Sequence, residues 1–499
     1  MLNTIFFWIF TLLGWLAGLL FLLFTYFFIQ DLRQTKSAIR RNFPLIGRLR
    51  YFLEGQGAYF RQYFLSHERE EMPFNRATRS WVYRKSKGLQ GMIGFGSTYD
   101  LNEAGAVIFV NSPYPKLEEE RQPAHSLVIG EYCNTPFYAQ QIVNISGMSY
   151  GALSKRAVQA LSLGAEKSGA WLNTGEGGMS DYHREANADL IFQIGTAKFG
   201  VRDEKGRLSP QKLKEVAKVE QVRAFEIKLS QGAKPGKGGM LPGIKVNAEI
   251  ARIRGIPIGQ DVMSPNRHPE IASPDDLLDM IAQIRDITGK PVGFKTVIGN
   301  ERYPESFAEA ILRRGVDSAP DFITIDGGEG GSGAAPQILA DHVGLSLTEA
   351  LPMVDNIFHE AGLRDRIRLI ASGKLVTADQ VAWALCVGAD FTVTGRGFLF
   401  SLGCIQSMQC HLDTCPTGIT TQNPRLQKGL DIINKSERVA NYATQINQDL
   451  DVIAHSCGLS CAHDFNRNHV RIVQKPGKSI SLNELYPLPK TNKSRFLKT

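Results

Sequence analysis

The alternation of short apolar segments with helical patterns limits the fold of this 499-residue chain more than any other feature. Eight apolar, β-branched segments recur from residue 140 onward, and each has the length of a buried strand. They are QIVNI (141–145), AWLNT (170–174), LIFQI (190–194), AFEIKL (224–229), VGFKTVI (292–298), FITID (322–326), IRLIAS (367–372) and FTVTG (391–395). Several are separated by helix-patterned stretches, two of which begin with Ser-Pro, a cap followed by proline at the first helical position. The alternation predicts the α/β class and a parallel (β/α)8 TIM barrel.

An open, doubly wound sheet is the alternative arrangement for alternating strands and helices. The count of eight strands favours the barrel. The chain also has no G-x-G-x-x-G sequence after a predicted strand, which is the mark of a dinucleotide-binding sheet. We therefore expect a closed barrel.

The N-terminal segment IFFWIFTLLGWLAGLLFLLFTYFFI, residues 5–29, carries no charged residue. Its 25 residues are enough to span a bilayer with some tilt. A signal peptide has a shorter apolar region with basic residues before it, whereas here the basic residues follow. A buried core helix is the other alternative, and the length and uniform apolarity argue against it. The positive-inside rule then predicts a single-pass membrane protein whose catalytic domain is cytoplasmic.

The sequence divides into four expected segments. A transmembrane anchor occupies residues 1–30, and a basic juxtamembrane segment with an irregular extension occupies 31–139. The barrel domain, with a cysteine-rich loop, covers 140–430, and a helical extension with a basic tail covers 431–499.

The net charge of +8 comes from two segments, one directly after the apolar N-terminal stretch and one at the C-terminal end of the sequence. Residues 31–50 and residues 475–499 carry +5 each, so the rest of the chain sums to −2. A nucleic-acid-binding protein concentrates basic residues on its binding domain. The nearly neutral middle of the chain therefore argues against nucleic acid as a partner.

Glycine-rich sequences follow the last predicted strands. Backbone N–H groups without side chains can approach phosphate oxygens closely, and a following helix N-terminus adds a positive dipole. TIM barrels favour phosphate binding after strands seven and eight. The sequences ASGK (371–374) and TGRG (394–397) therefore predict phosphate contacts at Gly373, Gly395 and Arg396.

Charged and amide side chains gather at the ends of strands two to five. Lys295 lies within a predicted strand, where an unpartnered ammonium group is costly. Over a flavin it would stabilise negative charge on the reduced ring, and the alternative is a buried structural salt bridge. The basic and amide groups at the ends of strands two to four suit a dicarboxylate substrate. The whole polar set is Asn173, Glu176, Gln193, Lys228, Gln231 and Lys234.

Three cysteines, Cys404, Cys410 and Cys415, follow the eighth strand within twelve residues. Cytoplasmic thiols stay reduced, which favours metal binding or catalysis over disulfides. The C-x5-C-x4-C spacing lacks the paired cysteines usual for zinc, although His411 could complete a Cys3His site. A Cys-Pro pair ends the loop, as is common for iron–sulfur ligands. From the spacing both centres remain open, with one of Cys457 and Cys461 as a possible fourth ligand.

The strand-end motifs together resemble the FMN-binding synthase domain of glutamate synthases. The resemblance covers roughly residues 140–430, with six long motifs in one order. They are SGMSYGALS, NTGEGG, EIKLSQGAKPGKGGMLPG, DGGEGGSGAAP, RDRIRLIASGKL and GCIQSMQCHLDTCPTGITTQ. GSGAAP stands where the family more often has Thr and Ser. The short, membrane-anchored members of the family are the most similar.

The resemblance implies FMN and a [3Fe–4S] cluster with Cys404, Cys410 and Cys415 as ligands. It implies the catalytic residues Lys295, Glu176, Lys228 and Gln231. The residues implied to bind FMN lie at the strand ends. They are Ser146, Met148, Ser149, Asn173, Gln193, Lys295, Gly327, Gly328, Gly331, Ser372, Gly373, Gly395 and Arg396.

The implied reaction is the reductive amination of 2-oxoglutarate, through 2-iminoglutarate, to L-glutamate, with electrons from an external donor such as ferredoxin. The sequence shows no glutaminase domain, so we expect ammonia or an amine from elsewhere. Two alternatives remain: a related transferase that forms N-methylglutamate, and a membrane-tethered electron-transfer subunit without amination activity.

Overall fold

A computed structural model of the chain describes residues 2–89, 91–120, 122 and 124–497. The chain forms two compact units, residues 1–79 and 80–499, which are described separately.

The first unit begins with α1 (Leu2–Arg33), followed by α2 (Ala38–Asn42), α3 (Ile46–Phe60) and a π-helical turn at Arg61–Leu65. By length and composition, residues 3–33 could cross a membrane, and none of their most apolar window is buried. The Asp31 carboxylate at the end of α1 is fully buried. It accepts hydrogen bonds from Arg40 (2.9 Å) and Arg48 (2.8 Å), so these ion pairs tie α1 to α2 and α3.

The expected irregular extension contains helices, which corrects the sequence prediction. Besides α2 and α3, the helix α4 spans Arg76–Ser86. These helices are short and mix basic with aromatic residues, so their apolar spacing is weak. One local signal was present, because the Ser37 side chain accepts a hydrogen bond from the Arg40 backbone and caps α2.

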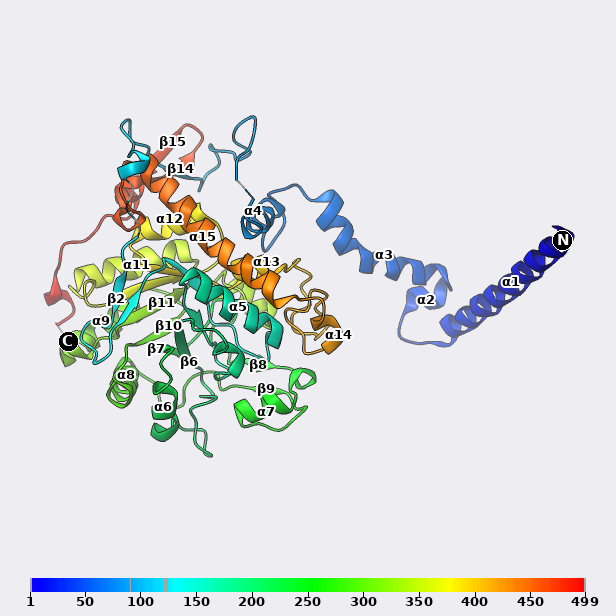
Figure 1. The fold of residues 1–499 in the computed structure, drawn as a ribbon, viewed down its shortest axis with the longest axis horizontal. Helices are drawn as coiled ribbons and strands as arrows, with labels where there is room; N and C mark the ends of the chain where they lie inside the picture. Colours follow the sequence, from blue (N-terminus) through cyan, green and yellow to red (C-terminus); the bar gives the residue numbers. More distant parts are fainter. Residues whose placement is uncertain (1, 90, 121, 123, 498–499) are drawn as a thin grey trace. The chain divides into compact units, whose positions relative to one another are not determined.

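The second unit contains a closed barrel of eight parallel strands, which confirms the predicted fold (Figure 1). The order around the barrel is β10-β11-β12-β13-β4-β5-β6-β7. The strands are β4 (Val143–Ile145), β5 (Leu172–Asn173), β6 (Leu190–Ile194), β7 (Val222–Lys228), β10 (Val292–Thr296), β11 (Phe322–Asp326), β12 (Arg368–Ser372) and β13 (Phe391–Thr394). Each lies within a predicted apolar segment or overlaps one.

Helices surround the barrel where the sequence predicts them. The Ser-Pro starts of α6 and α8 are confirmed as caps, because Ser209 and Ser273 each accept a hydrogen bond from the first helical turn. The outer helices are α5 (Lys155–Ser168), α6 (Pro210–Ala217), α8 (Pro274–Thr288), α9 (Arg302–Arg314), α11 (Leu347–Glu360), α12 (Ala378–Val387) and α13 (Arg396–Leu402).

Shorter elements lie in the connections. The short helices are α7 (Ala248–Arg254), α10 (Gln337–His342) and α14 (Pro424–Gln427), and the strands β8 (Met240–Leu241) and β9 (Val262–Met263) pair with each other. The 3-10 turns are Glu118–Glu120, Asp181–His183, Gly243–Lys245, Val316–Ser318, Ala462–Asp464, Arg467–His469 and Lys493–Arg495.

An apolar cluster closes the N-terminal end of the barrel. The antiparallel pair β2 (Leu127–Ile129) and β3 (Phe137–Ala139) packs against residues at the starts of the barrel strands. The ring of Trp171 lies 5.8 Å from that of Phe137 and 5.1 Å from that of Phe391. Because this end is filled with apolar side chains, the opposite end is left for polar chemistry.

The C-terminal extension is only partly helical. The helix α15 (Ile432–Ser456) lies along α5, and Gly164 allows the approach, since a Cβ there would meet the Val439 side chain at 2.3 Å (Figure 1). The strands β14 (Val470–Lys475) and β15 (Lys478–Ser481) then form a sheet with β1 (Val107–Phe109), and a short helix, α16 (Leu482–Leu485), follows. The predicted helix is therefore present as α15, whereas the strands β14 and β15 were not predicted. These strands are too short to show clear alternation, and the Pro-Gly between them was the available turn signal.

We expect Asp321→Ala to lower the free energy of unfolding by about 3–5 kcal/mol, because removing one partner leaves buried cations uncompensated. The fully buried Asp321 carboxylate accepts hydrogen bonds from Arg285 (3.0 Å), Arg366 (3.0 Å) and the Val292 backbone (2.8 Å). Urea denaturation of the full chain in detergent measures the loss. The control is Asp317→Ala, which removes an exposed carboxylate nearby and should change little. Equal stability of the two variants would contradict the assignment.

Candidate active site at the C-terminal end of the barrel

A small polar cavity lies inside the barrel above the apolar end. Its lining comes from all eight barrel strands or the residues next to them. The polar groups among its lining residues are Ser146, Asn173, Glu226, Lys295 and Thr324, together with the Gly147 backbone. Four of these six residues either belong to the predicted site set or directly adjoin one of its members, and Glu226 and Thr324 are the residues that sequence reasoning missed.

Glu226 is the central acceptor of the cavity. Its side chain is 2% exposed and accepts hydrogen bonds from Asn173 Nδ2 (2.8 Å), Gln193 Nε2 (2.6 Å) and Thr324 Oγ1 (2.6 Å). These bonds fix the orientation of both predicted amide side chains. The sequence signal was available, because Glu226 is a charged residue within the apolar strand AFEIKL.

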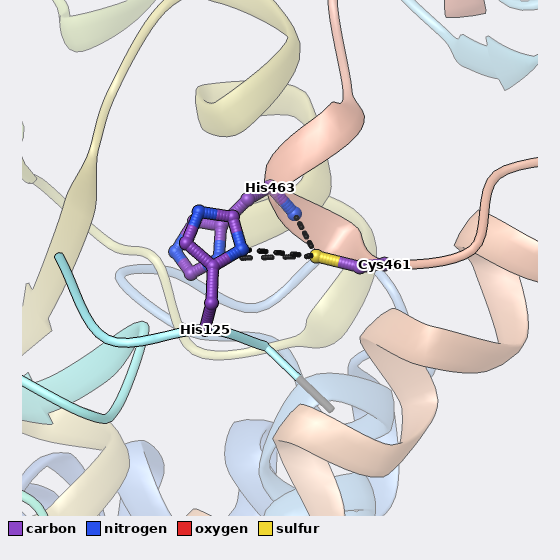
Figure 2. Close-up of side chains that lie close together, drawn as sticks. All are labelled: His125, Cys461 and His463. Atoms are coloured by element: carbon purple, nitrogen blue, oxygen red, sulfur yellow. Dashed lines mark hydrogen bonds between the residues drawn. The ribbon is translucent and has the colours of Figure 1, made fainter. Parts of the chain in front are cut away.

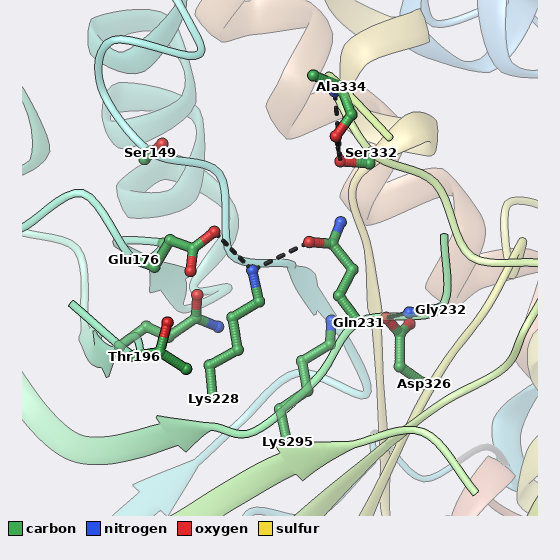
Figure 3. Close-up of polar contacts among 12 residues, drawn as sticks. Ser149, Glu176, Thr196, Lys228, Gln231, Gly232, Lys295, Asp326, Ser332 and Ala334 are labelled. Atoms are coloured by element: carbon green, nitrogen blue, oxygen red, sulfur yellow. Dashed lines mark hydrogen bonds and ion pairs between the residues drawn. The ribbon is translucent and has the colours of Figure 1, made fainter. Parts of the chain in front are cut away.

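A second cluster lies nearer the mouth of the barrel (Figure 3). Lys228 Nζ donates to Glu176 Oε1 at 2.8 Å and to Gln231 Oε1 at 3.0 Å. Gln231 Nε2 in turn donates to the Gly331 carbonyl at 2.7 Å. The structure therefore brings together three of the four predicted catalytic residues, and it connects them to the loop after β11.

Two further cations surround Glu176. Burial would raise the pKa of Glu176, but the charges of Lys228, Lys234 and Arg254 outweigh burial and hold that pKa below its ordinary value. Burial, with the charge of Lys228, lowers the pKa of Lys234 to about 8. Three cations around one carboxylate leave a net positive site that suits an anionic ligand.

Arg254 is a buried site residue that the sequence analysis did not single out. It lies at the end of α7 and donates to the Tyr150 carbonyl at 3.1 Å and to Ser149 Oγ at 3.4 Å. Burial lowers its pKa to about 10. No strand pattern marks α7, so the sequence offered no signal that this arginine turns toward the site.

Lys295 pairs with a carboxylate from the next strand. Its Nζ lies 3.4 Å from Asp326 Oδ2, which also accepts a hydrogen bond from the Gly232 backbone at 2.8 Å. Asp326 Oδ1 accepts from Ser372 Oγ at 2.7 Å, so Ser372 supports the pair. Lys295 thus both forms the salt bridge considered from the sequence and lines the cavity.

Close backbone approaches join the strand-end loops. A Cβ on Gly147 would lie 2.8 Å from Asn173 Oδ1 and 2.9 Å from Gln193 Nε2, so a side chain there would fill the lip of the cavity. A Cβ on Gly395 would lie 3.6 Å from Met148 Sδ, and one on Gly373 would lie 3.2 Å from the Gly327 nitrogen.

The backbone of the loop after β11 is fixed to its neighbours. The Gly327 N–H donates to the Ser372 carbonyl at 2.8 Å, and the Gly328 N–H donates to the Leu345 carbonyl at 2.7 Å. The predicted glycines from β11, β12 and β13 therefore share one end of the barrel with the β4 loop.

The Arg396 side chain points to a different partner from the predicted phosphate. Its guanidinium donates to the Ser332 carbonyl at 2.6 Å and lies 3.8 Å from Cys410 Sγ. Burial would lower the pKa of Arg396, but the negative charges of Cys410 and Cys404 outweigh burial and raise it. This arginine therefore links the barrel mouth to the cysteine loop.

The three predicted cysteines lie around Arg396 in one loop. Lys245, itself almost fully buried, donates to the carbonyls of Cys410 and Thr420, both at 2.6 Å. Burial would raise the pKa of Cys415, but hydrogen bonds from Thr417 and Thr420 outweigh burial and lower it. Hydrogen-bonding neighbours of this kind stabilise the Cys415 thiolate, the form that binds metal, whereas burial raises the pKa of Cys404.

The sulfur positions argue against a single zinc ion in this loop. Within the part of the chain that the structure describes, Cys404, Cys410 and Cys415 are not a group whose ligand atoms all lie within 4.8 Å of one another. Thiolates on one tetrahedral zinc ion lie about 3.8 Å apart. His411 is exposed. A centre in which each thiolate binds a different metal atom fits the wider spacing.

Cys461 is not a fourth ligand to this loop, which corrects one of the alternatives. Its sulfur faces His125 and His463, beside the segment that leads into β2 at the apolar end of the barrel. The three-cysteine loop follows the opposite end of β13. Cys461 and the three-cysteine loop therefore lie at opposite ends of the barrel.

Comparison with known proteins gives one consistent family. A sequence model described as the conserved region in glutamate synthase matches residues 103–460. The chain is 39% identical to the glutamate synthase large subunit-like protein YerD of Bacillus subtilis (strain 168), over 96% of this chain and 98% of that protein. It is 30% identical to a glutamate synthase large subunit-like protein of Rhizobium meliloti (strain 1021), over 80% of this chain and 90% of that protein.

The chain is also similar to a group of longer proteins. The chain is 35% identical to the archaeal-type glutamate synthase [NADPH] of Thermotoga sp. (strain RQ2), over 65% of this chain. The match spans 61% of the length of that relative.

We expect Glu226→Gln to destabilise the barrel by about 1–3 kcal/mol, because the new amide N–H group faces donors from Asn173, Gln193 and Thr324. Urea denaturation measures the effect. Glu204→Gln, which makes the same change at an exposed position, is the matched control and should be neutral. If both variants unfold like the unmodified chain, Glu226 is not the acceptor described here.

Proposed function

Because the chain belongs to the glutamate synthase family, we propose that it is an oxidoreductase that forms L-glutamate from 2-oxoglutarate and ammonia, using FMN and an iron–sulfur cluster. The observation that carries the proposal is the pairing of two sites at one end of the barrel. One is the positively charged cluster around Glu176, and the other is the cysteine loop, which Arg396 connects to Ser332, next to the Gly331 carbonyl that accepts from Gln231.

The cavity residues fit a flavin. Ser146, Asn173 and Lys295 line the cavity, and a Cβ on Gly147 would close its lip. The family resemblance implies a phosphate near Gly327, Gly373 and Gly395, which follow β11, β12 and β13. Bound FMN would supply hydride transfer, and Lys295 would stabilise negative charge on it. The remaining proposed contacts are Met148, Ser149, Gln193, Gly328, Gly331 and Ser372, with the backbone N–H of Arg396 in place of its side chain.

The cationic pocket fits a dicarboxylate. Lys228, Lys234 and Arg254 offer positive charge to the substrate carboxylates, and Glu176 with Gln231 holds Lys228 in place. Ammonia condenses with the keto carbon with loss of water to give 2-iminoglutarate. Addition of a hydride and a proton then gives L-glutamate. The pocket orients the imine carbon, while the buried Lys234 ammonium is placed to supply a proton.

The cysteine loop fits an iron–sulfur centre. Cys404, Cys410 and Cys415 are proposed as ligands of a [3Fe–4S] cluster, with Arg396 and Lys245 offsetting negative charge on the loop. The archaeal-type relative is named for NADPH and is longer than the matched region. We propose that electrons reach this chain from a separate donor such as ferredoxin or a reductase subunit.

The apolar helix α1 supports membrane attachment. Phe10, Trp15 and Phe21 are 70%, 77% and 71% exposed, which is costly in water and favourable in lipid. We propose that α1 anchors the chain in a membrane, with the barrel on the cytoplasmic side.

We expect the purified full chain, supplied with reduced ferredoxin, 2-oxoglutarate and ammonium, to form L-glutamate, detected by mass spectrometry with 15N-ammonium. Cys410→Ala should lose cluster iron and ferredoxin-driven turnover while FMN remains bound, because its sulfur lies in a separate loop. Incorporation only from methylamine would instead identify an N-methylglutamate-forming enzyme. Reduction of the flavin without any amino acid product would identify an electron-transfer subunit.

We expect kcat/KM for 2-oxoglutarate to fall above about pH 8, because Lys234 loses its positive charge as the pH rises through its lowered pKa. Steady-state rates at a constant concentration of unprotonated ammonia measure this. Lys234→Arg keeps the charge and should move the fall to higher pH. An unchanged pH profile in that variant would rule out Lys234 as the titrating group.

A further inference from the structure

A second cluster of metal-ligating side chains lies away from the proposed active site (Figure 2). Cys461 and His463 follow the end of α15, and His125 comes just before β2. The Cys461 sulfur lies 4.0 Å from His125 Nδ1 and 3.9 Å from His463 Nδ1. All three ligand atoms lie within 4.8 Å of one another, and among the residues that the structure describes this is the only such group.

The cluster joins two segments that are far apart in the sequence. His125 and Cys461 are separated by 336 residues. Backbone hydrogen bonds hold the segments side by side, from Ser112 to the Ser456 carbonyl (2.8 Å) and from Gln122 to the Ser460 carbonyl (3.1 Å). The first segment leads into β2, which packs into the apolar cluster below the barrel.

We propose that Cys461, His125 and His463 bind a zinc ion. Zinc takes thiolate and imidazole ligands, and in a tetrahedral site with bonds of 2.3 and 2.0–2.1 Å the sulfur and nitrogen lie about 3.6 Å apart. The observed separations of 3.9 and 4.0 Å need only a small inward shift of the side chains. On binding, the Cys461 thiol gives its proton to solvent and the zinc–sulfur bond forms.

A cluster held only by hydrogen bonds explains the geometry less well. A thiol has one proton, so hydrogen bonds alone require the sulfur to donate to one imidazole and to accept from the Nδ1–H of the other. The sulfur already accepts a hydrogen bond from the His463 backbone at 3.3 Å. Two imidazole nitrogens directed at one sulfur from separate segments are the arrangement that one metal ion produces.

Zinc suits the site better than copper. Two His and one Cys also occur in blue-copper sites, where the three ligands lie in a plane with a weak axial ligand. Here His125 is exposed and Cys461 is buried, so the open side of the cluster faces solvent. A water molecule can complete a tetrahedral zinc site from that side.

The proposed ion is a structural link and is independent of the proposed catalytic function. It would connect the segment before β2 to the C-terminal extension, so that the part of the chain closing the barrel is held at both ends. Because metal binds only the folded arrangement, the folded state gains stability when zinc is present.

The test uses the full chain in detergent, purified with its iron centre intact, with Zn2+ and Co2+ as probes. Elemental analysis should find about one zinc per chain in addition to iron, as the three-ligand site requires. After chelation, Co2+ should give a sulfur-to-cobalt charge-transfer absorption, and added Zn2+ should remove it and raise Tm.

Three variants locate the ion. Cys461→Ala and His463→Ala should lose the zinc, and His125→Gln, at an exposed position, should weaken Co2+ binding by more than about tenfold. Cys457→Ala is the matched control, because it removes a buried thiol from the same segment outside the cluster. It should keep the zinc and the cobalt spectrum.

Two results would overturn the proposal. One is a wild-type chain that shows no cobalt–sulfur absorption and no zinc-dependent change in Tm. The other is zinc content and cobalt absorption that persist in Cys461→Ala and in His125→Gln, which would place the metal in the three-cysteine loop. Iron content, flavin content and glutamate formation are measured separately. A failure of the catalytic proposal can therefore be distinguished from a failure of the zinc proposal.

Discussion

The buried carboxylate of Glu226 lies at the boundary between the apolar and the polar part of the barrel interior. The rest of the site depends on how this carboxylate is held. Below it the barrel is filled by Trp171, Phe391 and the β2–β3 pair, and above it polar groups begin. A buried carboxylate is tolerated only when hydrogen bonds satisfy it, and here three donors from three strands do so. The same three bonds fix Asn173 and Gln193, so one interaction both stabilises the barrel interior and orients the floor of the site.

At the mouth of the barrel, unlike at Glu226, the positive and negative charges are not balanced. Glu176 is surrounded by more positive charge than it can neutralise, and burial prevents water from screening the excess. An anionic ligand would offset this imbalance. The positive charge of Lys295, in contrast, is balanced by Asp326. Ser372 and Gly232 hold that carboxylate in place.

Sequence reasoning recovered the features that lie along single strands. All eight barrel strands were visible because parallel strands buried on both faces are continuous apolar segments. Glu226 and Asp326 were visible as charges within such segments, although their role was not drawn. Arg254 was not visible, because it reaches the site from α7, and the contact between His125 and Cys461 depends on segments 336 residues apart. The helices α2, α3 and α4 were missed because their weak apolar spacing resembles that of a loop.

Two cations, Lys245 and Arg396, connect the cysteine loop to the barrel, and each makes different contacts. Lys245 binds the carbonyls of Cys410 and Thr420, so it fixes the path of the loop backbone. Arg396 begins α13 directly after β13, and its guanidinium reaches both the Ser332 carbonyl and the Cys410 sulfur. The position of the thiols relative to the barrel mouth is therefore set by the end of a core strand. Because the same cations offset thiolate charge, a metal centre in this loop and the polar pocket beside it share one electrostatic environment, and a change of charge in one is felt in the other.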